Sequence, residues 1–128
     1  MNFIKVTLNP GKAGKIEATL PGGGKLTLAG QGKTIAAGEQ ATLGIRPEHL
    51  LVGEKGDAQL KGHLRLAEYL GSETMFYASL PDGSDISAKA DGLATAAAGS
   101  NIAIGLPAKA CHLFDAAGKT ILNGDLTK

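Results

Sequence analysis

The sequence predicts an all-β fold, a small barrel or sandwich of short strands with little helix. Three observations support this prediction. Nineteen glycines and five prolines divide the 128 residues into short segments, which is typical of many strands joined by turns. Within most segments apolar and polar residues alternate, whereas long stretches of helical periodicity are missing. The chain also repeats itself at a spacing of about sixty residues.

The repeat is clearest in two pairs of segments. Residues 18–23 read Ala-Thr-Leu-Pro-Gly-Gly, and residues 78–83 read Ala-Ser-Leu-Pro-Asp-Gly. Residues 36–45 correspond to residues 96–106, where the inserted Ala98 moves the offset from 60 to 61. Similarity at a fixed offset marks structural units that complete each other's core. We therefore expect two similar half-units within one pseudo-symmetric β domain.

Composition fits a single domain over residues 1–128, with pseudo-repeats at about 15–50 and 75–115. The formal net charge of +1 argues against a nucleic-acid partner, because nucleic-acid surfaces carry a strong basic excess. The lone Cys111 leaves no internal disulfide and fits a reducing compartment. Neither a membrane-spanning apolar run nor a secretory signal is found. We therefore expect a cytoplasmic protein.

The first half is predicted to contain four strands and one helical turn. Residues 3–8 alternate and are rich in β-branched side chains, which favours a strand. Residues 15–20 and 25–28 are strands on either side of a Pro-Gly-Gly-Gly hairpin connection. Residues 40–46 form the next strand. Residues 47–50 read Pro-Glu-His-Leu, and proline at the first position is typical of a helical turn.

The second half begins with the longest predicted strand, residues 58–70. Its leucines keep an even register and are expected to share one face: Leu60, Leu64, Leu66 and Leu70. A strand at residues 74–80 also places four side chains on one face: Thr74, Phe76, Ala78 and Leu80. After the hairpin signal Asp82-Gly83, four further strands are expected: residues 85–89, 101–106, 111–114 and 119–122. Residues 91–99 are rich in Ala and Gly and receive no assignment.

Residue patterns typical of catalysis, metal binding or cofactor binding are not found. Gly-Lys-Thr ends a P-loop, but the glycine required earlier is replaced by Thr27 before residues 32–34 and by Leu113 before residues 118–120. Both segments are predicted to be surface turns. The three histidines lie far apart without convergent ligands, and structural roles are expected for them: His49, His63 and His112.

Two polar clusters lie beside predicted turns, where partner contacts commonly occur. The first is at the end of the strand at residues 40–46, and the second surrounds the turn after residue 70. Two interpretations remain open, a buried or turn-capping Arg–Glu pair and a contact site for a partner. The candidate contact residues are Arg46, Glu48, His49, Glu68, Tyr69, Glu73 and Thr74.

These clusters also carry a resemblance to a known family. Residues 44–49, 68–74 and 105–107, with residues 112–115 and Gly118, occur in an order that resembles the C-terminal regulatory domain of sugar-importer ABC ATPases. The similarity is to the maltose and glycerol-phosphate importer type. It implies an OB-like β-barrel of the transport-associated (TOBE) type, built from both halves of the chain.

The resemblance also implies function and partners. We expect a non-catalytic regulatory and dimerisation domain, because the complete P-loop, the Leu-Ser-Gly-Gly-Gln signature and the Walker B run are missing. ATP and Mg²⁺ would bind a nucleotide-binding domain that this chain lacks, so no cofactor is expected here. The implied partners are a second copy of the subunit, cytoplasmic regulatory proteins and, through the missing domain only, membrane permease subunits. The expected location is the cytoplasmic side of the cell membrane.

Two alternatives remain. Related duplicated barrels bind oxyanions such as molybdate, and the chain is alternatively a small-ligand or sugar-binding module using Ser87, Lys89 and Ser100. A nucleic-acid-binding OB barrel would need exposed aromatic side chains beside basic residues. Three Phe, two Tyr and no Trp argue against it.

Overall fold

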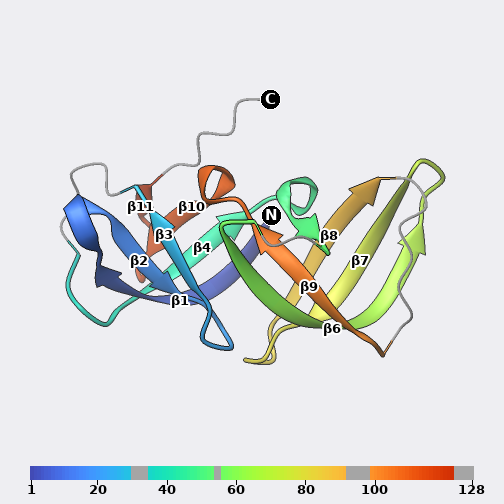
Figure 1. The fold of residues 1–128 in the computed structure, drawn as a ribbon, viewed down its shortest axis with the longest axis horizontal. Helices are drawn as coiled ribbons and strands as arrows, with labels where there is room; N and C mark the ends of the chain where they lie inside the picture. Colours follow the sequence, from blue (N-terminus) through green and yellow to red (C-terminus); the bar gives the residue numbers. More distant parts are fainter. Residues whose placement is uncertain (30–34, 54–55, 92–98, 123–128) are drawn as a thin grey trace.

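Strands dominate the described part of the chain in a computed structural model. The structure describes residues 1–29, 35–53, 56–91 and 99–122. Two antiparallel sheets lie side by side (Figure 1). The first sheet has the order β11-β10-β4-β1-β2-β3, and the second has the order β5-β9-β6-β7-β8. The prediction of an all-β fold with little helix is therefore confirmed.

The strand bounds agree with most of the predicted segments to within two residues. The first sheet contains β1 (Asn2–Pro10), β2 (Ile16–Thr19), β3 (Lys25–Leu28), β4 (Glu39–Ile45), β10 (His112–Asp115) and β11 (Thr120–Leu122). The second contains β5 (Leu51–Val52), β6 (Ala58–Tyr69), β7 (Glu73–Ser79), β8 (Asp85–Asp91) and β9 (Asn101–Leu106). The two-residue strand β5 was not predicted.

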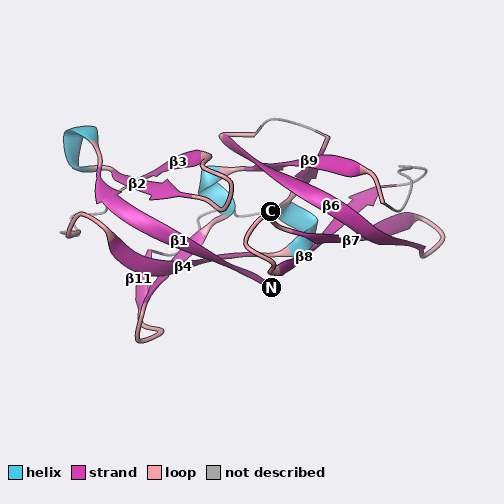
Figure 2. Ribbon diagram, turned by 90° about the horizontal axis from the view of Figure 1, so that it is seen from below, coloured by secondary structure: helices cyan, strands magenta, loops and turns pink. Residues whose placement is uncertain are grey.

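Three short 3-10 turns interrupt the strands: η1 (Lys12–Gly14), η2 (Pro47–His49) and η3 (Ala108–Ala110). The turn η2 was predicted from its proline, whereas η1 and η3 were not. Figure 2 shows η2 and η3 between the two sheets and η1 at the far end of the first sheet. Within the described residues, no helix has the length and hydropathy needed to cross a membrane.

The two halves of the chain repeat the same topology. The first half orders its strands β4-β1-β2-β3 and the second orders them β9-β6-β7-β8, which is the Greek-key order in both cases. Their hairpin turns use the same hydrogen bonds at an offset of 60. Leu20 N–H donates to Gly24 O at 2.6 Å, and Leu80 N–H donates to Ser84 O at 2.8 Å. The sequence repeat therefore corresponds to a repeat in structure.

Each half also supplies a strand to the other half's sheet. After β4 the chain passes through η2 into the second sheet, where β5 pairs with β9. After β9 it passes through η3 into the first sheet, where β10 pairs with β4. Neither sheet is complete without this exchange, so the two halves are interlocked.

The core is continuous between the sheets. Leu43 and Ile45 from β4 belong to the same buried cluster as Leu60, Ile104 and Leu106 from β6 and β9. All five side chains are fully buried, and burying each of them contributes about 1.5–3 kcal/mol to folding. The alternation in these strands therefore turns one apolar face of each sheet toward a shared interior.

A β-bulge corrects one prediction about β6. Leu60 and Leu64 are fully buried as expected, but Leu66 is 55% exposed and Leu70 is 50% exposed. The register shifts between Leu64 and Leu66, which leaves Arg65 as the extra residue of the bulge. Because one inserted residue moves every later side chain to the opposite face, Leu66 points to the outside. The predicted shared face of Thr74, Phe76, Ala78 and Leu80 is confirmed, since all four are buried.

Candidate functional site

A hollow of about 360 Å³ lies at the seam of the second sheet. The edge strand β5 pairs with β9 and also packs against β8 at the opposite edge, so the sheet closes on itself there. We call this hollow the seam site. Its main lining residues are Glu48 from η2, Leu51 and Val52 from β5, Glu73 from β7 and Lys89 from β8.

The turn η2 places Glu48 at the seam. Pro47 starts the turn with its fixed φ, and two hydrogen bonds close it, from His49 N–H to Arg46 O at 3.0 Å and from Leu50 N–H to Pro47 O at 3.3 Å. Leu50 is buried and holds the turn against the core. Glu48 is exposed, so its carboxylate is available to a partner.

The seam site carries more negative than positive charge. Lys89 Nζ lies 2.9 Å from Glu73 Oε2, and the two side chains are 37% and 32% exposed. With Glu48 the lining holds two carboxylates and one ammonium group. An added anion would have to compete with Glu73 for Lys89 and would face Glu48, whereas a cationic side chain would gain a partner. The site is therefore suited to a basic group on another molecule.

The structure brings together only part of the predicted contact set. Glu48 and Glu73, from clusters 25 residues apart in sequence, line the same hollow. Glu68 lies away from it, on the outer face of β6, where its Oε1 accepts a hydrogen bond from Tyr77 O–H at 3.3 Å. Tyr69 ends β6 and is 60% exposed.

Thr74 is a correction to the predicted contact set. Its side chain is 0% exposed, because it shares the inner face of β7 with Phe76. A partner cannot reach it. The Arg–Glu interpretation is also wrong for Arg46 and Glu48, since both are exposed and the ion pairs among the described residues lie elsewhere.

The three residues proposed for small-ligand binding do not converge. Ser87 uses its N–H and O–H on the side chain of Asn2, and Lys89 is paired with Glu73. Ser100 lies beside β6, where its C=O accepts a hydrogen bond from Leu64 N–H at 2.8 Å. The strand β7 separates β6 from β8. Ser100 therefore lies two strands away from Ser87 and Lys89, which are both on β8.

Asn2 is a structural residue that sequence reasoning missed. Its Nδ2–H donates to Ser87 O at 2.7 Å, and its Oδ1 accepts from Ser87 N–H at 2.8 Å. Its side chain therefore acts as one more peptide unit along the edge of β8 and joins the two sheets. The partner is 85 residues away, so no local pattern could have indicated the contact.

The histidines and the Gly-Lys-Thr segments are the other residues that the sequence singled out. His49 lies in η2, His63 is exposed on β6 and His112 lies in β10. In the turn between β10 and β11, Asp115 Oδ1 accepts hydrogen bonds from Ala117 N–H at 2.9 Å and Lys119 N–H at 2.8 Å. The segment at 118–120 is thus part of a tight surface turn. Residues 32–34 lie outside the described residues.

Cys111 is a buried thiol with a shifted pKa. Burial, and secondarily the nearby Asp57 carboxylate, raise the pKa of Cys111 to about 12. Its Sγ–H donates to Pro107 O at 3.4 Å. The thiol therefore stays protonated at neutral pH and is a core side chain without nucleophilic character.

Comparison with known proteins adds family information. The TOBE domain family model matches residues 43–114, and the MalK OB fold domain model matches residues 1–50. The chain is 35% identical over 120 residues to the maltose/maltodextrin import ATP-binding protein MalK of Aliivibrio fischeri, covering 93% of this chain and 32% of that protein. The MalK of Salmonella typhimurium is 31% identical over 115 residues, with 89% and 31% covered. The chain thus spans about a third of the length of these relatives.

A solved structure gives a likeness at the level of the fold. The cytoplasmic molybdate-binding protein ModG, with molybdate bound, superposes with a TM-score of 0.72 at 17% sequence identity. The match covers 88% of this chain and 94% of the ModG chain. At this identity the likeness concerns the arrangement of the strands alone.

Proposed function

This chain belongs to the TOBE domain family, and we propose that it is the accessory domain of the ATP-binding subunit of a carbohydrate importer. It acts through protein–protein contacts, and ATP and Mg²⁺ bind a separate nucleotide-binding domain. Its partners are a second copy of the subunit and cytoplasmic regulatory proteins, on the cytoplasmic side of the membrane. Contact with the permease is made through the nucleotide-binding domain.

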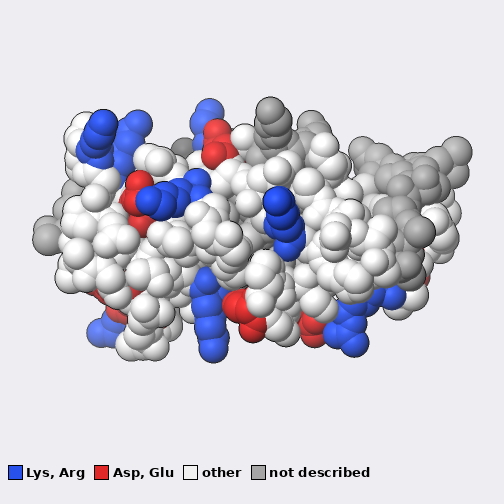
Figure 3. Space-filling view, turned by 60° about the horizontal axis from the view of Figure 1, so that its bottom comes forward, with Lys and Arg blue, Asp and Glu red and all other residues white. Residues whose placement is uncertain are grey.

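One observation carries this proposal beyond the family. One residue from each polar cluster lines the seam site, where Glu48 and Glu73 lie with Lys89 in an accessible hollow. Rigidly held turns with exposed charge are common contact points, and the excess of carboxylates supports a partner that presents a lysine or arginine. On the face shown in Figure 3, a few acidic and basic side chains are scattered among uncharged ones.

The test uses the full-length ATP-binding subunit that contains this sequence. Sedimentation in the absence of ATP should show dimers for the full subunit and monomers for a subunit from which residues 1–128 have been removed. ATP hydrolysis should be retained by the nucleotide-binding domain and should not occur with the 128-residue chain alone. Equal dimerisation with and without residues 1–128, or hydrolysis by the chain alone, would contradict the proposal.

Charge reversal tests the seam site in the same subunit. Glu48→Lys changes an exposed side chain, so it should alter stability by no more than about 0.5 kcal/mol. It should weaken the effect of a cytoplasmic regulatory protein on ATP hydrolysis while the basal rate stays the same. The matched control is Glu17→Lys on the first sheet, and an equal loss in both variants would exclude the seam site.

The oxyanion-binding alternative has less support. It draws on a likeness of fold, and its three residues are separated, with Lys89 already paired to Glu73. Titration calorimetry with molybdate and sulfate tests it directly. Saturable heat at submillimolar ligand would favour this alternative, and its absence at millimolar ligand would exclude it.

A further inference from the structure

A groove of about 600 Å³ lies on the outer face of the second sheet. Its volume is within the range of about 300–1,000 Å³ that is usual for small-molecule sites. Its main lining residues come from four strands: Asn2 of β1, Arg65 and Leu66 of β6, Tyr77 of β7, and Asp85 and Ser87 of β8. Among the described residues, none lines both this groove and the seam site. The groove is therefore a separate candidate site.

One part of the groove is apolar. Leu66 lies opposite Tyr77 in the pairing of β6 with β7, and the two side chains are 55% and 36% exposed. The hydrogen bond from Tyr77 O–H to Glu68 Oε1, at 3.3 Å, holds the far end of the tyrosine ring. A fixed aromatic ring beside an exposed leucine offers a packing surface for the C–H groups of a ligand.

An ion pair spans the groove. Arg65 Nη1 on β6 lies 3.2 Å from Asp85 Oδ1 on β8, so the pair crosses the intervening strand β7. Each charge already has its counter-charge, and an ionic ligand would have to displace one of the two partners. The contact uses one of the five N–H donors of the guanidinium and one of the two carboxylate oxygens. A neutral ligand with hydroxyl groups can use the others and leave the pair intact.

The edge of the groove is polar and fixed in place. Asn2 is 7% exposed and is joined to Ser87 by three hydrogen bonds, of 2.7, 2.8 and 3.2 Å. An amide nitrogen carries two N–H groups, and within the described residues only one of those of Asn2 has an acceptor, Ser87 O. The hydroxyl oxygen of Ser87 also keeps its capacity to accept. Asn2 and Ser87 therefore add a donor and an acceptor to the groove.

Together these groups match a neutral sugar ring. Adjacent hydroxyl groups of a sugar each donate and accept, so one hydroxyl can accept from Arg65 while its neighbour donates to Asp85. The C–H groups on one face of the ring are apolar and can pack on Tyr77. A purely apolar ligand would instead cover the ion pair without replacing its bonds to water, which is costly. From this geometry we propose that the groove binds a neutral sugar through adjacent hydroxyl groups and one face of its ring.

The inference goes beyond the proposed function and does not depend on it. The sequence suggested Ser87, Lys89 and Ser100 for binding a small ligand, and of these only Ser87 lines the groove. Because the groove is open and its polar contacts are few, the affinity should be weak, with a Kd of about 1 mM. The chain would then bind a carbohydrate in addition to its protein partners.

NMR titration of the isotopically labelled 128-residue chain tests the proposal. Methyl glucoside should shift the amide signals of Leu66, Tyr77 and Ser87 in a saturable way. Cyclohexanol has a ring of the same size but lacks adjacent hydroxyl groups, and it should bind about fivefold more weakly or less. Sulfate should leave these signals unchanged, because Arg65 is already paired with Asp85.

Substitutions in the groove separate the contribution of the ring from that of the ion pair. Tyr77→Ala should weaken glucoside binding by about threefold to tenfold through loss of the packing surface, whereas Tyr77→Phe keeps the ring and should retain binding. Asp85→Asn should weaken glucoside binding by about fivefold. It should also create sulfate binding, because Arg65 is then left without its carboxylate partner.

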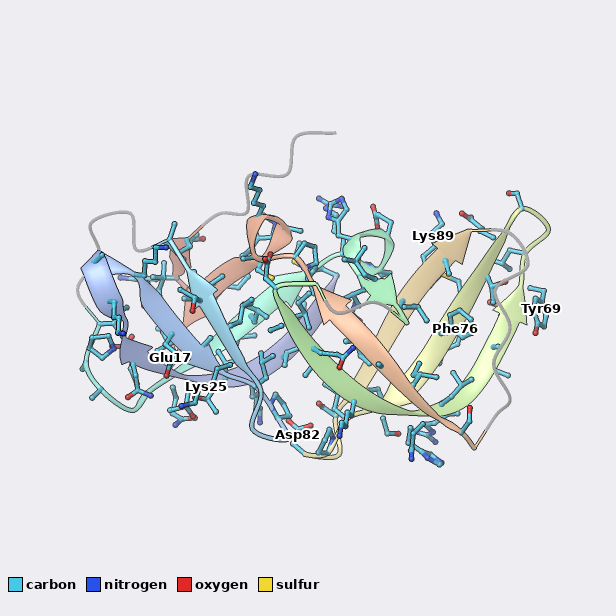
Figure 4. All side chains as sticks on the ribbon, in the orientation of Figure 1. Glu17, Lys25, Tyr69, Phe76, Asp82 and Lys89 are labelled. Atoms are coloured by element: carbon cyan, nitrogen blue, oxygen red, sulfur yellow. The ribbon has the colours of Figure 1, made fainter. Side chains whose placement is uncertain are left out.

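The matched control is Glu17→Gln, which removes the carboxylate of another exposed ion pair, that with Lys25 on the first sheet (Figure 4). It should change neither glucoside nor sulfate binding. The same loss in Glu17→Gln and Asp85→Asn would contradict the role given to the groove.

Three further results would overturn the inference. The first is the absence of saturable shifts at tens of millimolar glucoside, and the second is saturable shifts confined to residues outside the groove. The third is unchanged glucoside binding in Tyr77→Ala and Asp85→Asn variants that fold by circular dichroism. The proposed function is tested by dimerisation and ATP hydrolysis of the full-length subunit, so its failure and the failure of this inference are distinguishable.

Discussion

At the scale of the residue, the side chain of Asn2 takes the place of a neighbouring strand at the edge of β8. The edge of β8 would otherwise expose the N–H and C=O of Ser87, and the amide of Asn2 satisfies both. Asn2 is 7% exposed, so these bonds are largely shielded from water. An unsatisfied buried N–H or C=O is costly, which makes this one side chain important to the joint between the sheets.

Asn2→Ala should lower the free energy of unfolding by about 1–3 kcal/mol, because Ser87 loses both partners in a partly buried place. Urea denaturation measures the change. Gln40→Ala is the matched control, since that amide is exposed and lies 3.4 Å from Thr7 Oγ1; it should change stability by no more than about 0.5 kcal/mol. Similar effects of the two substitutions would contradict the role given to Asn2.

Cys111 makes stability depend on pH in the alkaline range. Its pKa is raised from an ordinary value of 9.0 to about 12 in the folded chain. The stabilisation is complete below pH 9 and is lost as the pH rises toward 12, because the unfolded thiol ionises first. Unfolding free energies measured at neutral pH and above pH 9 should show this decline. Cys111→Ala should reduce the slope, and an unchanged slope would assign the decline to other groups.

At the scale of the element, alternation predicts strands well until a bulge intervenes. The even register of β6 holds for Leu60 and Leu64 and fails at Leu66, because Arg65 is an extra residue opposite β7. A bulge depends on the pairing of two strands, and the sequence of β6 alone contains no signal for it. The turn η3 could have been found, since it lies at the position equivalent to η2 in the repeat.

Gly56→Ala should be strongly destabilising. Gly56 has φ +58, and an added Cβ would lie 2.8 Å from the backbone nitrogen of Leu106, where the two residues form a parallel bridge. Left-handed strain and the backbone clash together should cost about 3 kcal/mol or more. Gly71 has φ +89, and an added Cβ would have no atom within 4 Å. Gly71→Ala therefore introduces backbone strain without a clash, and it should lower the free energy of unfolding by about 1 kcal/mol. Equal losses in thermal or urea unfolding would exclude the clash.

The part of the candidate site that depends on neighbouring residues in the sequence could be predicted, whereas the part that depends on contacts between distant strands could not. Glu48 and Glu73 could be named as contact candidates because charge beside a turn is visible in the sequence, and their role as contacts stays a prediction. Their meeting at the seam site depends on β5 closing the second sheet, which needs the tertiary structure. Thr74 was misassigned because the same cluster hides an inward-facing position of β7.

At the scale of the whole molecule, the exchanged strands β5 and β10 couple the two sheets. If the other half unfolds, the first sheet loses β10 and β11 and the second loses β5, so the chain should unfold in one cooperative step. The tyrosines provide a test, because Tyr69 and Tyr77 both lie in the second sheet and the chain has no Trp. Urea curves from tyrosine fluorescence and from far-ultraviolet circular dichroism, which reports both sheets, should have the same midpoint.

A reporter in the first sheet completes that comparison. Phe3 is 59% exposed on β1, so Phe3→Trp should fold normally and give a fluorescence signal from the first sheet. Its midpoint should coincide with that of the tyrosines. Separate midpoints would mean that the exchanged strands do not couple the halves.

The bond between Asn2 and Ser87 has a mechanical consequence. Through β1 the start of the described chain is woven into the first sheet, and through Asn2 it is tied to the edge of the second. A pull or a twist applied at the first residues is therefore shared by both sheets from its point of entry. The two sheets should therefore move together as one rigid body, without bending relative to each other.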